Sequence, residues 1–165
     1  MVRRFFSTIL AIGAVLGFGV VLLTPAAARA QERPFKAMLT GNAHLSPTDV
    51  PWILRNDETG QGAATHLGDF TWNDVEYADF AQVPGGVAVV ATFTMTAADG
   101  DQLYGAFTST GFFADASTLV IHGSYQFTGG TGRFAAATGS GDIDAVALLA
   151  PGLPFSGTFD GTIDY

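Results

Sequence analysis

The segment from Leu119 to Val146 constrains the fold more than any other part of the chain. It reads LVIHGSYQFTGGTGRFAAATGSGDIDAV, in which two runs typical of β-strands are joined by a stretch with glycine at positions 129, 130, 132, 139 and 141. Glycine is needed where the backbone takes a positive φ or lies close to another backbone, and it weakens a helix. The segment therefore predicts two strands joined by a tight, irregular connection.

The rest of the chain also has the period of strands. Val87–Thr96 places the apolar residues Val89, Ala91, Phe93 and Met95 on one face and Val90 with three threonines on the other, and Asp99-Gly100 predicts a hairpin turn after it. No stretch after Gln31 has a convincing helical period with caps. Ser46–Gly60 holds two prolines and the polar run Arg55-Asn56-Asp57-Glu58, so we expect a long loop there. The predicted strands are 35–45, 62–72 continuing into 75–80, 87–96, 102–110, 119–127, 143–149 and 155–163.

This pattern predicts an all-β fold. Short sequential strands, hairpin turns and glycines within strands favour a closed antiparallel β-barrel of about eight strands, because closure removes the sheet edges and glycine lets a sheet coil. About 135 residues follow position 30, which suits a single domain, 31–165, with one core.

Residues 1–30 have the features of a signal peptide. Arg3 and Arg4 precede the apolar run Ile9–Leu23, and Ala28-Arg29-Ala30 is a small-x-small cleavage site. The run is shorter than the roughly 20 apolar residues that span a bilayer, which favours cleavage over an uncleaved anchor. We therefore expect a secreted protein, periplasmic or extracellular, with no membrane contact after cleavage.

The charge of the segment after residue 30 limits its partners. It keeps four basic residues and all fifteen acidic ones, a formal charge of −11. Such a chain is a poor partner for nucleic acid or for an anionic lipid surface. The chain has no cysteine, so disulfides, zinc–thiolate sites and thiol nucleophiles are excluded.

A few residues stand out as candidate ligand contacts. The alternation places His66 on one strand face with Phe70 and Trp72, which predicts a cavity-lining group, although a core histidine bonded to a backbone carbonyl is the more ordinary interpretation. Tyr104 joins them only if its hairpin is bulged or twisted near Gly105.

We recognise no catalytic or metal-binding motif in the sequence. The three histidines are far apart in sequence, and Glu58 and Glu76 have no sequence-local partner. Asp142 and Asp144 share a strand face and could hold a hard cation, but as acidic residues on a strand they fit a solvated surface better. Arg133 could bind an anionic ligand group, and a structural pair with a nearby carboxylate fits it better. We predict no cofactor and no metal.

Three pieces of the sequence carry a family resemblance: Ala64–Gly68 with Phe70-Thr71, Ala98–Leu103, and Gly129–Phe134 with Ala137–Ser140. Together they resemble secreted bacterial proteins related to the allene oxide cyclase and dirigent barrels, over about Gly62 to Tyr165. The resemblance implies an eight-stranded barrel of calycin type with an apolar cavity, often assembled as a dimer or trimer. Relatives bind a small hydrophobic substrate and guide cyclisation or radical coupling.

Three functions follow as hypotheses. The leading one is binding of a small hydrophobic molecule inside the barrel, because most of the fourteen phenylalanines follow residue 30 and supply apolar lining, and no catalytic constellation is apparent. The second is a cofactor-free cyclase or isomerase of the allene oxide cyclase or dirigent type. The third is a structural or adhesive exported protein whose barrel is filled by its own side chains.

Overall fold

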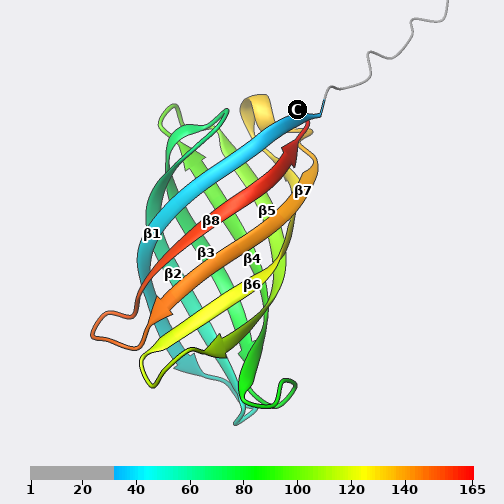
Figure 1. Cartoon of the computed structure of the whole chain (residues 1–165). Helices are drawn as coiled ribbons and strands as arrows, with labels where there is room; N and C mark the ends of the chain where they lie inside the picture. Colours follow the sequence, from blue (N-terminus) through cyan, green and yellow to red (C-terminus); the bar gives the residue numbers. More distant parts are fainter. Residues whose placement is uncertain (1–31) are drawn as a thin grey trace, which may run out of the picture.

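The computed structural model describes residues 32–165, which form a closed barrel of eight antiparallel strands (Figure 1). Each strand pairs with the next along the chain, and β1 also pairs with β8. This confirms the predicted all-β barrel, whereas the expected signal peptide, 1–30, lies outside the described residues. The strands are β1 (Arg33–Pro47), β2 (Ile53–Ala64), β3 (Gly68–Asp79), β4 (Gly86–Ala97), β5 (Gln102–Phe113), β6 (Thr118–Gly130), β7 (Gly139–Leu148) and β8 (Pro154–Ile163).

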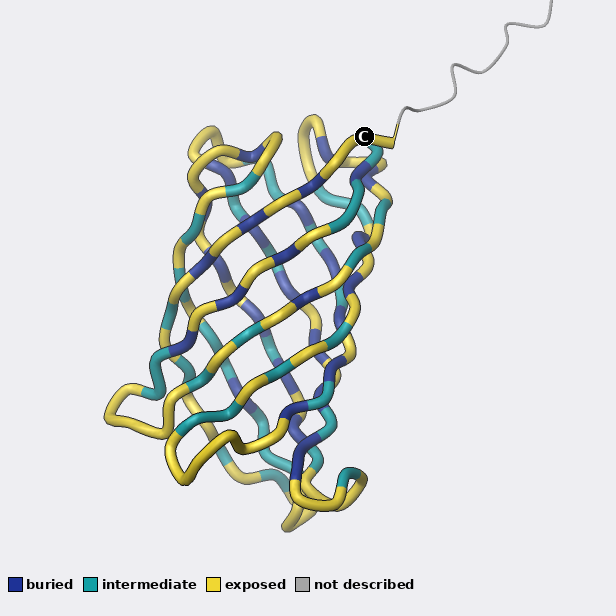
Figure 2. The backbone as a smooth tube through the Cα atoms, in the orientation of Figure 1, coloured by how far each residue is buried: buried dark blue, intermediate teal, exposed yellow. Residues whose placement is uncertain are grey.

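Alternation along each strand sorts side chains between the interior and the outer wall. In β4, for example, Val89, Ala91, Phe93 and Met95 are buried, and the residues between them are more exposed. Figure 2 shows the same alternation of buried and exposed positions along the strands that face the viewer. Period-two patterning therefore fixes which residues can meet inside the barrel.

The barrel has two ends that differ in their contents. At the His66 end, where β1, β3, β5 and β7 begin, aromatic rings fill the interior. Trp72 stacks on Phe93 with ring centroids 4.9 Å apart, and Phe159 contacts both rings edge-on. At the opposite Trp52 end, many inward positions of β1, β6 and β7 are small and only half-buried, among them Gly41, Ala43, Gly123, Ala145 and Ala147.

Two facing glycines allow β1 and β2 to approach closely. Gly41 pairs with Gly60 across the two strands. A Cβ atom on Gly41 would lie 2.3 Å from the carbonyl oxygen of Thr59, and one on Gly60 would lie 2.5 Å from that of Thr40. Both distances are far below contact, so this part of the wall requires residues without a side chain.

Two predicted elements were wrong. The expected loop Ser46–Gly60 is mostly strand, because β1 continues to Pro47 and β2 begins at Ile53. The expected strand Gly62–Trp72 is interrupted by a turn, in which His66 has a φ of 70°. In β2 the inward residues include the polar Asn56 and Glu58 and two glycines, which hid the strand from a search for apolar alternation.

The glycine-rich connection after β6 is irregular, as predicted. The register of β5 and β6 shifts between Tyr104 and Gly105, and the 3₁₀ turn η1 (Gly132–Phe134) follows. Arg133 pairs with Asp99 and Asp101 of the β4–β5 turn, which confirms the structural interpretation of this arginine. None of the helical segments within residues 32–165 is long and apolar enough to cross a membrane.

Candidate site: a carboxyl cluster inside the barrel

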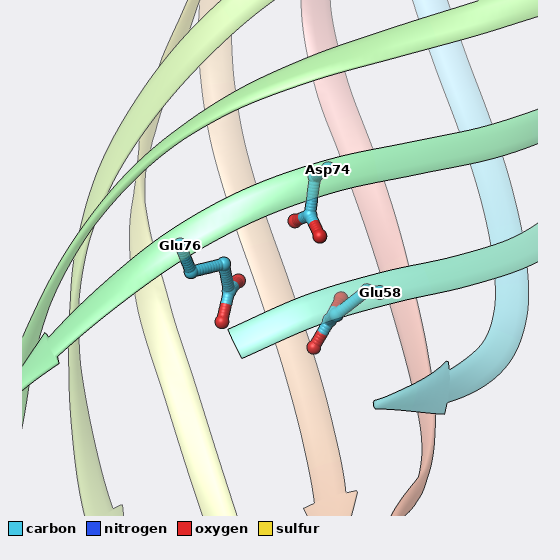
Figure 3. Close-up of side chains that lie close together, drawn as sticks. All are labelled: Glu58, Asp74 and Glu76. Atoms are coloured by element: carbon cyan, nitrogen blue, oxygen red, sulfur yellow. The ribbon is translucent and has the colours of Figure 1, made fainter. Parts of the chain in front are cut away.

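Neighbouring strands β2 and β3 place a group of polar side chains inside the barrel. Asn56 and Glu58 point inward from β2, and Asp74 and Glu76 point inward from β3. The strand register sets Asn56 opposite Glu76 and Glu58 opposite Asp74, so the four side chains form one cluster. The three carboxyl groups converge in Figure 3, with one oxygen of each lying within 4.8 Å of the others.

Asn56 holds two of the three carboxyl groups. Its Nδ2 donates hydrogen bonds to Glu58 Oε1 at 2.9 Å and to Glu76 Oε2 at 2.8 Å. The Oδ1 atom of Asn56 and both carboxyl oxygens of Asp74 are buried without a hydrogen-bond partner, and these residues are only 6% and 5% exposed. Buried polar atoms normally have partners, so three unpartnered oxygens in one cluster require an explanation.

Burial raises the pKa of all three carboxyl groups, and repulsion by neighbouring carboxylates adds to this effect at Glu58 and Asp74. Burial, followed by the charge of Glu76, raises the pKa of Glu58 to about 8. Burial, with the charges of Glu58 and Glu76, raises the pKa of Asp74 to about 10. Burial also raises the pKa of Glu76. At neutral pH the isolated cluster therefore holds protons that exposed carboxyl groups would have lost.

No basic side chain of the described residues compensates the cluster. Lys36 pairs with Asp160 at 2.5 Å, and Arg55 pairs with Asp57 at 2.6 Å. Arg133 pairs with Asp99 and Asp101, and the guanidinium of Arg33 lies 4.8 Å from the ring centroid of Tyr165. The negative charge of the cluster must therefore be balanced by protons or by a cation from outside the chain.

Aromatic side chains border the cluster on the side of the filled core. Trp72 lies two residues before Asp74 on the same inward face, and Phe93 of β4 pairs with Asp74 in the register. The Trp72 indole is near enough to Glu58 to favour the charged carboxylate, but its Nε1 meets no hydrogen-bond geometry. A ligand at the carboxyl groups would thus find apolar rings and an unused N–H donor beside it.

The cluster can hold two kinds of cation. Three carboxylates with the Asn56 Oδ1 atom are hard oxygen ligands of the kind that Ca²⁺ prefers. A protonated amine is the other kind. Its three N–H donors, at about 2.9 Å from their acceptors and in tetrahedral directions, place three oxygens roughly 4.7 Å apart. Both occupants fit carboxyl oxygens that lie within 4.8 Å of one another.

The residues predicted from sequence do not form one site. Phe70 and Trp72 point inward as expected and belong to the filled core. His66, predicted beside them, lies exposed in the β2–β3 turn, where its Nε2 is 3.1 Å from the carbonyl oxygen of Pro34. Its predicted place on the inward strand face is wrong, because the turn replaces the strand.

Tyr104 is on the outer wall. Its hydroxyl donates a hydrogen bond to Gln102 Oε1 at 2.7 Å, and the register shift beside Gly105 does not turn it inward. The extra residue is in β6, where Thr128, between Phe127 and Gly129, has no partner on β5. The alternation of side chains along β5 is therefore unchanged.

The outer wall holds the other acidic pair considered from sequence. Asp142 and Asp144 are exposed on β7, and Asp144 accepts a hydrogen bond from His122 Nδ1 at 2.7 Å, which raises the pKa of His122. His122 is likewise exposed on the outer wall. A hollow of about 1030 Å³ also lies on the outer wall, but its lining side chains, such as Met38, Thr71 and Val120, bring no reactive groups together.

Sequence reasoning missed the carboxyl cluster. Asp74 and Glu76 have the same strand parity as Phe70 and Trp72, and this signal was present in the sequence. Glu58 could be found only by treating Arg55–Glu58 as strand.

Comparison with known proteins found no matching protein family, no matching curated protein and no matching solved structure.

Proposed function

We propose that the protein binds a small molecule inside its barrel, and that this molecule has an apolar body and a positively charged amino group. The carboxyl groups of Glu58, Asp74 and Glu76 hold the amino group, and the neighbouring aromatic side chains contact the body. The observation that carries the proposal is the cluster of three buried carboxyl groups without a compensating cation among the described residues.

The surroundings of the cluster support an organic cation. Trp72 and Phe93 lie against it, and aromatic faces attract ammonium groups as well as apolar groups. Ala43 of β1 and Ala145 and Ala147 of β7 are small inward residues that are only half-buried, which supports a less filled interior toward the Trp52 end. A ligand therefore enters from the Trp52 end and meets the carboxyl groups before the packed rings.

A second candidate function is favoured by the raised pKa values. Glu58, whose pKa is raised to about 8, is in large part a neutral acid at pH 7 and can donate a proton in a dry site. This supports the cyclase or isomerase suggested by the resemblance to allene oxide cyclase and dirigent barrels. The third hypothesis, a structural barrel filled by its own side chains, is supported only by the packed rings at the His66 end.

A series of three matched probes tests the proposal. Calorimetry would compare 1-naphthylmethylamine with 1-naphthalenemethanol and 1-naphthoic acid, which share the ring but differ in charge. We expect the amine to bind at least about tenfold more tightly than the alcohol, and the acid not to bind. Glu76→Gln should remove this preference, whereas Asp142→Asn, on the outer wall, should not.

Other outcomes would overturn the proposal. Equal affinity for amine and alcohol would show an apolar site that does not use the carboxyl groups. Binding of Ca²⁺ without binding of the amine would make the cluster a metal site. Conversion of an epoxide or another reactive probe, lost in Glu58→Gln, would favour the enzyme, and no binding of any probe would favour the filled structural barrel.

A further inference from the structure

Large apolar side chains on the surface are gathered at one end of the barrel. Twelve of the thirteen that are exposed among the described residues lie in the half of the barrel at the Trp52 end, and only Met38 lies in the other half. We call these twelve the apolar belt. Its members are Leu45, Val50, Trp52, Tyr77, Phe80, Val90, Phe112, Phe113, Val120, Val146, Leu148 and Leu149.

The belt runs around the barrel and is not confined to one side. Val50 and Trp52 are in the connection between β1 and β2, and Phe80 follows β3. Phe112 and Phe113 end β5, and Leu149 follows β7. All four connections at this end, which lie together at the bottom of Figure 1, thus have exposed apolar residues in them or directly beside them. A second copy or a globular partner would cover one side, whereas a lipid surface meets all four connections at once.

The charges at this end select the kind of lipid. Asp49, Asp79 and Asp115 lie in or beside the same connections, and Arg55, which is the only lysine or arginine of the described residues in this half, is paired with Asp57. The other lysine and arginine residues of the described chain, Arg33, Lys36 and Arg133, are at the His66 end. An anionic surface would therefore be repelled by the belt end, and a zwitterionic one would not.

We infer that the Trp52 end docks on a zwitterionic lipid surface, with the belt side chains at the depth of the headgroups. Tryptophan, tyrosine and phenylalanine in the belt suit that depth, because their rings are apolar and indole and phenol groups also have a polar tip. The inference does not depend on the carboxyl cluster. It also departs from the sequence-based expectation of a protein without membrane contact after signal cleavage.

The two tryptophans make the test specific. Trp52 is 53% exposed in the belt, whereas Trp72 is 2% exposed in the core, so docking changes the environment of Trp52 alone. The experiment uses residues 31–165, because every strand of the closed barrel lies within that segment and the apolar run 9–23 would itself bind lipid. We expect flotation with phosphatidylcholine vesicles, a blue shift of tryptophan emission, and quenching by brominated phosphatidylcholine.

Paired variants test whether vesicle binding depends on the belt or on any exposed apolar side chain. Phe112→Ser with Phe113→Ser, and Leu148→Ser with Leu149→Ser, should each weaken vesicle binding by roughly tenfold or more. Met38→Ser removes an exposed apolar side chain outside the belt and should have no effect. Circular dichroism would confirm that the variants keep the barrel, and binding of the naphthyl amine should be unchanged in them.

Three results would overturn the inference. The first is no flotation with phosphatidylcholine. The second is flotation only with vesicles containing phosphatidylglycerol. The third is concentration-dependent association in sedimentation velocity that the belt variants abolish, which would assign the belt to contact between copies of this chain.

Discussion

Asp74 is the residue whose environment is least favourable to a charge. Both of its carboxyl oxygens are buried without partners, and the nearest charged groups are the carboxyl groups of Glu58 and Glu76. An amide of the same shape would carry no charge there. The residue therefore costs folding stability, which is what is expected of a group retained for binding or reaction and not for packing.

The first prediction concerns Asp74→Asn. The pKa of Asp74 is raised to about 10 in the folded protein, well above its value in the unfolded chain. The folded state thus binds more protons than the unfolded state, and stability falls as pH rises from about 4 toward 10. The variant escapes this loss. In urea unfolding, its gain over the wild type should be larger at pH 8 than at pH 5, by at least about 1.4 kcal/mol.

Asp142→Asn is the matched control, because Asp142 is exposed on the outer wall. It should change the free energy of unfolding little at either pH. A destabilised Asp74→Asn protein at pH 8 would contradict the account and would show that the carboxyl group makes a favourable structural interaction.

At the scale of elements, β2 shows what the sequence could and could not reveal. Strands such as β4 were predictable, because their inward residues are apolar and their turns have hairpin residues. In β2 the side chains of Asn56 and Glu58 point inward. Because these inward residues are polar, the segment lacks the apolar alternation of a strand, and its sequence predicts a loop. The His66 turn was missed because Gly62–Trp72 also fits a period of two. The carboxyl cluster thus lies where the sequence departs from the usual apolar pattern of a core.

The close approach of β1 and β2 gives a second prediction. Gly41→Ala would place a Cβ 2.3 Å from the Thr59 carbonyl oxygen and also 2.8 Å from the Phe155 ring. Since the backbone must move to relieve this, we expect a loss of roughly 1–3 kcal/mol in unfolding free energy. Gly157→Ala is the control. Its Cβ would meet its nearest neighbours at 3.5 Å, so stability should change by less than about 1 kcal/mol. Equal losses in the two variants would show that close packing of β1 and β2 is not the cause.

At the scale of the whole molecule, three groups of residues with different properties follow one another along the barrel axis. Packed rings at the His66 end hold the fold together, the carboxyl cluster gives the interior a negative site, and the apolar belt surrounds the Trp52 end. The barrel itself was predictable, because hairpin turns and strand glycines are read directly from the sequence. Which side chains of different strands meet inside the barrel was not predictable, since this depends on strand register. Secretion and assembly as a dimer or trimer stay predictions.

Proton release on binding tests the central claim most directly. If a protonated amine replaces protons on Glu58, Asp74 and Glu76, binding of 1-naphthylmethylamine at pH 7 must release protons, because the cluster holds them in the free protein. Calorimetry in buffers of different ionisation enthalpy measures that number. We predict release of about one proton or more per amine bound, and tighter binding at pH 8 than at pH 6. Amine binding without proton release, and with the same affinity at both pH values, would contradict the assignment of the carboxyl cluster as the binding site.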